Sequence, residues 1–437
     1  MAFPSPGFPL SNPLPQVGEG TCAQGMGKGD NAGLRYLIPL LLCSFAACAG
    51  EFNAALTLAP EWRGMETASP YYVAPPLVAA GRRAMRSDLE LRYRDGGLNA
   101  QGTLRGNARE GESAQTKGIL NQLYFDGESG AGSGYTAGKK VLSWGVGQGF
   151  RPLDLIQRED RRQLNPPPLE GVPLLAWQRY DAADSLTVAW SNPGYGAAAL
   201  DRDDPGIAAY WYRLAERDDL HAVARISRRH KLEAGAGWAR ALGEEWTFHA
   251  AALYQRRGLT PLNTLAENGG TPLAAADPMQ ESARDGAVKA VAGMQWTGRA
   301  GFGVLLEGWY DGEAWTREQW RRLDALAATQ HGLAAAVPQS WVDGNLAWSS
   351  RAFEYPNLLR ENLLLRLSYE EENWKTHLEW LSTPRDGGLV TSAAATWQGD
   401  RQRVSFGLRH PGGAAGSAYA RSPQARMAFV EWRYALR

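Results

Sequence analysis

The sequence predicts an all-β fold: a transmembrane antiparallel β-barrel of roughly sixteen to eighteen strands, with one helix in a long loop. Three observations indicate this fold class. The chain closes on a strictly alternating aromatic strand, the same two-residue period recurs along most of the sequence, and glycine, tryptophan and tyrosine are abundant. In such a barrel one face of each strand meets lipid, the other meets water, and closure pairs every backbone group.

The last strand is predicted over residues 428–436. One face carries Ala428, Val430, Trp432, Tyr434 and Leu436. Glu431 and Arg433 fall on the opposite face. Soluble domains rarely end on so apolar an alternating strand, whereas a closed barrel needs one to pair with its first strand.

Composition excludes several other classes of protein. The formal net charge is zero, so no basic footprint for nucleic acid is present. The 50 Gly suit tight turns, and the 17 Trp and 16 Tyr suit two aromatic belts at the membrane surfaces. A mean hydropathy of −0.38 argues against a bundle of membrane helices. Cys22, Cys43 and Cys48 all precede residue 50, so a disulfide-built secreted domain is excluded.

The front of the chain resembles a targeting segment. Residues 34–49 hold an apolar run of about a dozen residues, too short to span a bilayer and suited to a signal peptide. We therefore interpret residues 26–49 as a signal peptide that is cleaved after the small residues 47–49. Lipidation of Cys48 stays open as an alternative, although Phe45 fits a lipoprotein site poorly. Residues 1–25 are rich in Pro and Gly, and we interpret them as an unstructured extension before a true start at Met26.

The mature chain shows repeated strand patterns. Residues 50–84 contain Pro60, Pro70, Pro75 and Pro76 and are expected to form an irregular periplasmic lead-in to a barrel of residues 85–437. Alternating segments are found at 88–94, 184–190, 220–227, 232–238, 246–254, 302–310, 363–369, 374–380, 389–397 and 403–409. The short connections 228–230, 298–301, 370–373 and 398–401 are expected on the periplasmic side. The long connections 191–206, 256–284 and 311–341 are expected outside.

The connection 311–341 is predicted to contain the helix. Thr316 and Gln319 form a capping-box pattern, and Gly332 can end the helix. The apolar face would consist of Trp320, Leu323, Leu326 and Ala327. This face favours a helix packed on the barrel rim, with receptor binding as the alternative.

Residues 145–172 interrupt the strand pattern with the densest cluster of charges in the chain. A loop folded into the lumen would place across the pore Arg151, Asp154, Arg158, Glu159, Asp160, Arg161 and Arg162. There they would narrow the pore and filter ions by charge. The alternative is a solvated external loop whose charges pair with one another. Leu153, Leu155 and Ile156 favour the inward-packed, plug-like interpretation, because a solvated loop has no use for them.

The polar strand faces are rich in arginine. The residues predicted to face the lumen are Arg92, Arg94, Arg225, Arg366, Arg403 and Arg409. Such a wall would favour anionic or polar solutes. Asp88, Glu90, Glu233 and Glu379 lie on the same faces, so mutual neutralisation is the alternative.

The sequence offers little support for an enzyme. The six histidines are scattered without metal-ligand spacing, so neither a metal site nor a cofactor is predicted. No Gly-x-Ser-x-Gly motif of a hydrolase is present. The glycine-rich stretch from Gly145 to Gly149 lacks the lysine of a phosphate-binding loop.

Over residues 85–437 the chain resembles the porin-like outer-membrane β-barrels of Gram-negative bacteria. Its stretch from Trp144 through Pro152 to Pro173 is similar to a loop of uncharacterised barrels, some of them grouped with alginate-export-like proteins. The resemblance implies an outer-membrane location in contact with lipid. It also implies periplasmic chaperones and the barrel-assembly machinery as partners, and passive transport. Such proteins usually end on an aromatic residue, whereas this sequence ends Leu436-Arg437.

These observations lead to three functional hypotheses. The first is a passive channel or exporter for a polar or anionic small solute, with residues 145–172 as the constriction. The second is a barrel without transport that serves as a structural or assembly partner of an export complex. The third, an outer-membrane hydrolase, is disfavoured by the missing motifs. No plug of the size used by energised receptors is expected, which argues against active import.

Overall fold

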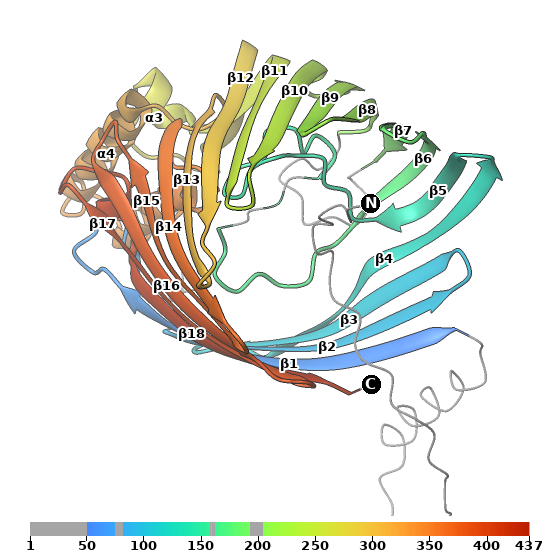
Figure 1. Ribbon diagram of the computed structural model, residues 1–437. Helices are drawn as coiled ribbons and strands as arrows, with labels where there is room; N and C mark the ends of the chain where they lie inside the picture. The colour runs from blue at the N-terminus through green and yellow to red at the C-terminus, as the bar shows by residue number, and fades with distance from the viewer. Residues whose placement is uncertain (1–49, 75–81, 158, 160–161, 193–203, 437) are drawn as a thin grey trace, which may run out of the picture. The chain divides into compact units, whose positions relative to one another are not determined.

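The computed structural model describes residues 50–74, 82–157, 159, 162–192 and 204–436. These residues form eighteen antiparallel strands that pair in chain order, and β1 closes the barrel by pairing with both β2 and β18 (Figure 1). The strands are β1 (Glu51–Met65), β2 (Arg83–Asp95), β3 (Leu98–Arg109), β4 (Gln115–Gly130), β5 (Ser133–Lys140), β6 (Val172–Tyr180), β7 (Asp184–Ser191), β8 (Gly206–Ala215), β9 (Asp218–Ser227), β10 (Lys231–Leu242), β11 (Trp246–Asn263), β12 (Met279–Thr297), β13 (Phe302–Asp311), β14 (Glu361–Glu371), β15 (Trp374–Thr383), β16 (Gly388–Gln398), β17 (Gln402–Gly413) and β18 (Gln424–Ala435). The predicted fold class is confirmed.

The alternation read from the sequence sorts the side chains onto two faces. Large apolar residues at outward positions are solvent-exposed, among them Leu120, Leu175, Ile207, Ile226 and Leu408. Their register partners across the sheet are also outward, as with Ile207 and Ile226 on β8 and β9. A continuous exposed apolar surface around a closed sheet is the surface that a bilayer covers.

The segment 50–84 is not the irregular lead-in that the prolines suggested. Residues 51–65 form β1, which pairs with β2 from Glu51 opposite Arg94 to Trp62 opposite Arg83. Pro60 is tolerated because the register with β18 skips Ala59 and Pro60, so the missing N–H falls where no ladder bond is made. The barrel therefore begins with β1 at Glu51 and not at residue 85, as the sequence predicted.

The two ends of the barrel differ. At one end, which we call the short-turn end, the connections are 96–97, 131–132, 181–183, 216–217, 243–245, 298–301, 372–373 and 399–401. At the other, the long-loop end, the connections include 141–171, 264–278, 312–360 and 414–423. This asymmetry is typical of membrane barrels. The turn 228–230 joins β9 to β10 and lies at the long-loop end, which corrects its predicted placement.

The long connection predicted over 256–284 is also mostly strand. β11 and β12 run as a paired ribbon as far as Asn263 opposite Met279, and α3 (Thr264–Asn268) follows in the remaining loop. Charged and polar residues on both faces of this ribbon, such as Arg284 and Asp285, are exposed, so no apolar alternation marked it in the sequence.

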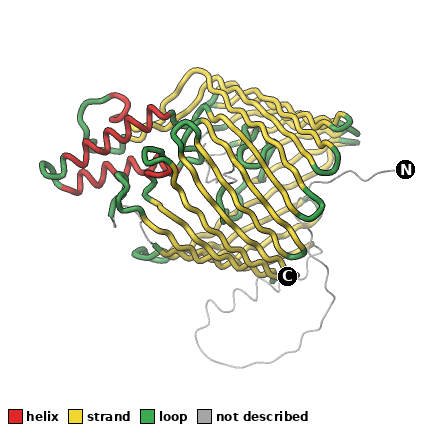
Figure 2. The backbone as a smooth tube through the Cα atoms, turned by 60° about the vertical axis from the view of Figure 1, so that its left-hand side comes forward, coloured by secondary structure: helices red, strands yellow, loops and turns green. Residues whose placement is uncertain are grey.

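Helices gather at the long-loop end (Figure 2). α4 (Arg317–Gly332) has the predicted capping box between Thr316 and Gln319, and α5 (Gln339–Ser350), with η1 (Arg351–Glu354), was not predicted. The buried face of α4 matches the predicted one: Trp320, Leu323, Leu326 and Ala327, together with Gln330. Among the described helices, none is long and apolar enough to cross a membrane.

The helices are tied to two other connections. The Tyr71 hydroxyl donates to Asp324 of α4 at 2.6 Å, and Arg421 of η2 (Tyr419–Arg421) forms an ion pair with the same carboxylate. Burial and then the charge of Asp324 raise the pKa of Tyr71 well above its usual value, so the phenol keeps the proton that it donates. The connections β1–β2, β13–β14 and β17–β18 thus form one packed cap at the long-loop end.

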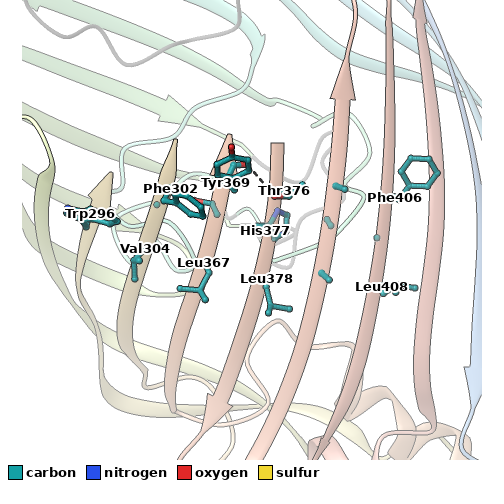
Figure 3. Close-up of a pocket in the computed structure, with 16 residues that line it drawn as sticks. Trp296, Phe302, Val304, Leu367, Tyr369, Thr376, His377, Leu378, Phe406 and Leu408 are labelled. Carbon is teal, nitrogen blue, oxygen red and sulfur yellow. Dashed lines mark hydrogen bonds between the residues drawn. The ribbon is translucent and has the colours of Figure 1, made fainter. Parts of the chain in front are cut away.

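The outward surface also carries a hollow of about 780 Å³ over β12 to β17 (Figure 3). The small side chains of Ala393 and Ala395 leave this space open, and the larger Leu367, Phe406 and Leu408 surround it. The register places these five residues on the outward face, so this hollow belongs to the membrane-facing surface and not to the lumen.

Candidate functional site

A long segment between β5 and β6, residues 141–171, runs inside the ring of strands (Figure 1). We call it the inner segment. Its two ends meet, because Lys140 and Val172 are direct partners in the β5–β6 ladder. The chain therefore leaves the wall, enters the lumen and returns to the position that it left.

Apolar packing holds the inner segment against one side of the lumen. Leu153, Leu155 and Ile156, which favoured inward packing in the sequence, are fully or almost fully buried. They belong to one cluster with inward-facing wall residues: Leu174, Val223, Leu253, Val291, Leu305 and Leu364. Each buried aliphatic side chain contributes about 1.5–3 kcal/mol. The segment is thus a fixed part of the lumen and not a solvated external loop.

A buried carboxylate clamps the tip of the segment. Glu307, on β13, accepts the backbone N–H groups of Gln148, Gly149 and Phe150 at 2.7, 2.9 and 2.9 Å. It also contacts His249 of β11, whose Nε2 lies 2.9 Å from Oε2 of Glu307. Three convergent backbone N–H groups form a cradle for one anion, which here belongs to the barrel wall.

The clamp explains the glycine-rich stretch. Gly147 has a φ of 104°, and a Cβ there would lie 2.3 Å from the Phe150 carbonyl oxygen. A Cβ at Gly149 would lie 2.8 Å from Leu364, because the backbone approaches the wall closely. Only glycine lets the chain turn this tightly onto Glu307.

We expect the substitution Gly147→Ala to loosen the clamp. The new Cβ meets backbone and not a movable side chain, so the turn must shift and its bonds to Glu307 must weaken. The expected result is a lower melting temperature and a noisier open-channel current in a planar bilayer. Gly118→Ala is the control, because a Cβ there meets nothing within 4 Å. Equal behaviour of the two variants would contradict the clamp.

Asp154 does not face the pore as the sequence suggested. It is buried and accepts the backbone N–H groups of Trp144 and Gly145 at 2.6 and 2.8 Å, and the Ser143 hydroxyl at 3.1 Å. Its neighbour Arg151 donates to the Gly147 carbonyl and to Ser143. The contacts of both side chains within the segment hold it folded upon itself.

The segment is also fastened to the opposite wall. Arg86 of β2 donates to the carbonyl and side-chain oxygens of Asn165 at 3.0 and 2.8 Å. Asn121, at a bulge in β4, donates to the Leu169 carbonyl at 3.1 Å. Arg409 of β17 donates to the carbonyl of Arg162. Attachments to β2, β4, β13 and β17 mean that the segment crosses the lumen.

Two cavities lie along the inner segment. The first, the inner chamber, has about 350 Å³ and lies between residues 166–169 of the segment and the wall of β1 to β4, β17 and β18. The second, the outer chamber, has about 260 Å³ and reaches Leu259, Glu281 and Tyr355 at the long-loop end. Glu159 lines both cavities. It therefore lies at the boundary between the two chambers.

Arginines dominate the exposed surface of the inner chamber. The side chains of Arg92 and Arg403 are 53% and 41% exposed, whereas those of their partners Glu90 and Glu431 are only 2% and 8% exposed. Arg433 pairs with Glu90, and Arg86 lies 3.1 Å from Glu431. The carboxylates lie beneath the guanidinium groups and fix them, so the surface offered to a solute is basic.

The other predicted lumen arginines differ in their surroundings. The register turns Arg94, Arg225 and Arg366 inward. Arg225 is buried between Asp204 and Glu233, each 3.0 Å from it, and Arg366 lies 2.6 Å from Glu379. At Arg225 and Arg366 the structure therefore matches the alternative prediction, in which neighbouring carboxylates neutralise the arginines. Arg94 is exposed near the short-turn end and donates to Asn99.

One further residue of the predicted constriction, Arg162, is among the described residues. Arg162 is nearly buried over the ring of Trp309, 5.6 Å from its centroid, and lines the outer chamber with Arg151. Arg158, Asp160 and Arg161 lie outside the described residues, as do the predicted signal peptide and Cys48. Within the described ranges, no group of three or more His, Cys, Asp or Glu residues could hold a metal ion.

Sequence reasoning missed several residues of this site. Glu307, Arg86 and Arg433 are single charged residues within alternating strands. Their partners are more than 150 residues away in the sequence, so no local pattern indicates these contacts. Glu431 and Arg433 were recognised as the polar face of the last strand. The two-residue period was the signal that could have added them to the lumen wall.

The described residues define the class of fold, which is a closed antiparallel β-barrel of eighteen strands. No protein-family profile matches the chain, and no curated protein does. Similar solved structures include two engineered variants of Rhodopseudomonas blastica porin. They are 14% and 13% identical, with TM-scores of 0.41 and 0.40, and each comparison covers 89% of this chain and 100% of the other. An engineered protein studied for asymmetric conductivity is 12% identical, with a TM-score of 0.40 and the same coverage.

Proposed function

We propose that this barrel is a passive outer-membrane channel for small polar or anionic solutes, which pass through both chambers and by Glu159. The exposed guanidinium groups above buried carboxylates carry this proposal, because a basic surface in a narrow, low-dielectric lumen concentrates anions. The outward apolar surface and the contrast between short turns and long loops support an outer-membrane location. The contact of Glu307 with the inner segment supports a fixed constriction and not a mobile plug.

The reversal potential in a salt gradient tests the proposal. Purified protein in a planar bilayer with unequal KCl on the two sides is expected to pass chloride in preference to potassium. The double variant Arg92→Gln/Arg403→Gln should lose much of that preference. Each buried carboxylate keeps a second arginine in this variant, since Arg433 still pairs with Glu90 and Arg86 with Glu431.

The matched control is Arg179→Gln/Arg240→Gln, which removes the same charge from outward positions of β6 and β10. It should leave the reversal potential unchanged. A preference for potassium, or a bilayer that never conducts, would overturn the proposed function. The second of these results would favour a structural or assembly role.

A further inference from the structure

The basic surface of the inner chamber continues beyond that chamber. Direct register partners link Arg403 on β17 to Arg433 on β18, and Arg433 to Thr57 on β1. Thr57 lies opposite Asp88 on β2, Asp88 opposite Arg105 on β3, and Arg105 opposite Lys117 on β4. Directly opposed residues point to the same face of a sheet, so all of these side chains face inward.

This row spans five steps between strands, which is roughly 24 Å at the usual strand spacing. Arg403 is the second residue of β17 and follows the short turn 399–401, whereas Lys117 is the third residue of β4, next to the long-loop end. Strands of a membrane barrel are tilted, so a row perpendicular to them climbs the wall. The row therefore connects the two ends of the lumen.

Arg86 and Arg92 join the row through shared carboxylates. Asp88 lies 2.7 Å from Arg105 and 3.3 Å from Arg86, and Arg86 reaches Glu431. We call the six basic residues the basic stripe: Arg86, Arg92, Arg105, Arg403, Arg433 and Lys117. It holds three carboxylates, Asp88, Glu90 and Glu431, so six positive charges face three negative ones and the excess is three.

The stripe is in contact with the inner segment at Arg86, which donates to Asn165. Arg86 lies opposite Asn107 and Arg105 lies two residues before Asn107 on β3, so both are in the half of the wall toward the long-loop end, as is Lys117, whereas Arg403 and Arg433 lie near the short-turn end. Basic side chains follow one another on β17, β18, β2, β3 and β4, and only β1, which carries Thr57 in this row, contributes none. An anion with two or more charged groups can hold one site while its other group reaches the next, which raises the effective concentration at that site.

We propose that the basic stripe selects small anions that carry two or more separated carboxylate or phosphate groups over anions with one. Arginine forks bind both kinds of group. This inference rests on the proposed channel function and names the class of solute for it. It adds Arg105 and Lys117, outside the inner chamber, as the residues that determine the preference.

Block of the chloride current tests the inference. Acetate, succinate and citrate are added in turn to the full-length protein in a planar bilayer, and the concentration that halves the current is recorded. For citrate this concentration is expected to be at least about tenfold lower than for acetate, with succinate between them. Arg105→Gln/Lys117→Gln should raise the citrate value by about threefold or more and leave the acetate value nearly unchanged. Asp88 keeps Arg86 as a partner in this variant.

The control is Arg228→Gln/Lys231→Gln, which removes two positive charges at the same end of the barrel, one from the β9–β10 turn and one from the first residue of β10. The inference is overturned if acetate and citrate block alike, or if both double variants affect citrate equally. A protein that conducts chloride selectively without a valence preference refutes the inference and keeps the proposed function. A silent or potassium-selective barrel refutes both. Unchanged circular dichroism confirms that each variant is folded.

Discussion

Replacement of residues 141–171 by a short Gly-Ser turn is expected to raise the single-channel conductance severalfold. The substitution is feasible because Lys140 and Val172 are direct partners across β5 and β6, so a tight turn can join them. Without the inner segment, the two chambers and the space that the segment fills become one lumen. The current through single channels in a planar bilayer measures the change.

The same variant should melt at a lower temperature, because inward-facing residues such as Leu253 and Leu364 lose their cover. The control replaces residues 110–114, an exposed connection between β3 and β4 at the same end, with the same turn. That variant should conduct like the original protein. If removal of residues 141–171 leaves the conductance at its original value, the segment does not restrict the pore.

Glu307→Gln is expected to release the tip of the inner segment while the barrel stays closed. The carboxylate accepts three backbone N–H groups and contacts His249. An amide has one acceptor oxygen and would turn an N–H₂ group toward donors. Loss of a buried carboxylate from such a set costs about 3–5 kcal/mol, enough to free the local structure. We expect rapid flickering between conductance levels in single-channel records and a lower melting temperature.

Glu379→Gln is the matched control, because Glu379 is buried on the neighbouring wall and pairs with Arg366 instead of the segment. It is expected to lower the melting temperature without adding flicker. Quiet records from Glu307→Gln at the original level would contradict the clamp. The clamp would also be contradicted if both variants flickered alike, since the effect would then be general loosening.

The alternation of apolar side chains made the barrel predictable from the sequence. A lipid-facing position must be apolar, so strands such as β9, with Leu220, Ala222 and Ala224 outward, can be read directly. The sequence does not indicate β1, because a proline such as Pro60 is typical of irregular structure; here the residue that lacks an N–H falls where the ladder with β18 has no pairing. The extension of β11 and β12 was missed because strands beyond the apolar surface need no alternation.

The candidate site was only partly predictable, since charge pairing depends on distant residues. The sequence indicated that Arg225 and Arg403 both lie on polar faces. It did not show that Asp204 and Glu233 bury the first while the second stays exposed above Glu431. The charge cluster in residues 145–172 correctly drew attention to the inner segment. The position of this segment is fixed by its buried apolar side chains and by the contact of its backbone with Glu307. The number of charges alone does not show that Asp154 accepts hydrogen bonds from backbone N–H groups instead of facing the pore.

Chemical modification at position 159 tests the path of the solute most directly. The three cysteines precede residue 50, so Cys22→Ser, Cys43→Ser and Cys48→Ser give a chain in which Glu159→Cys is the single thiol. A bulky, negatively charged thiol reagent is expected to remove most of the current through this channel, because residue 159 lines both chambers. The same reagent on the outward Leu378→Cys should have no effect. An undiminished current after complete modification at position 159 would contradict a path through the two chambers.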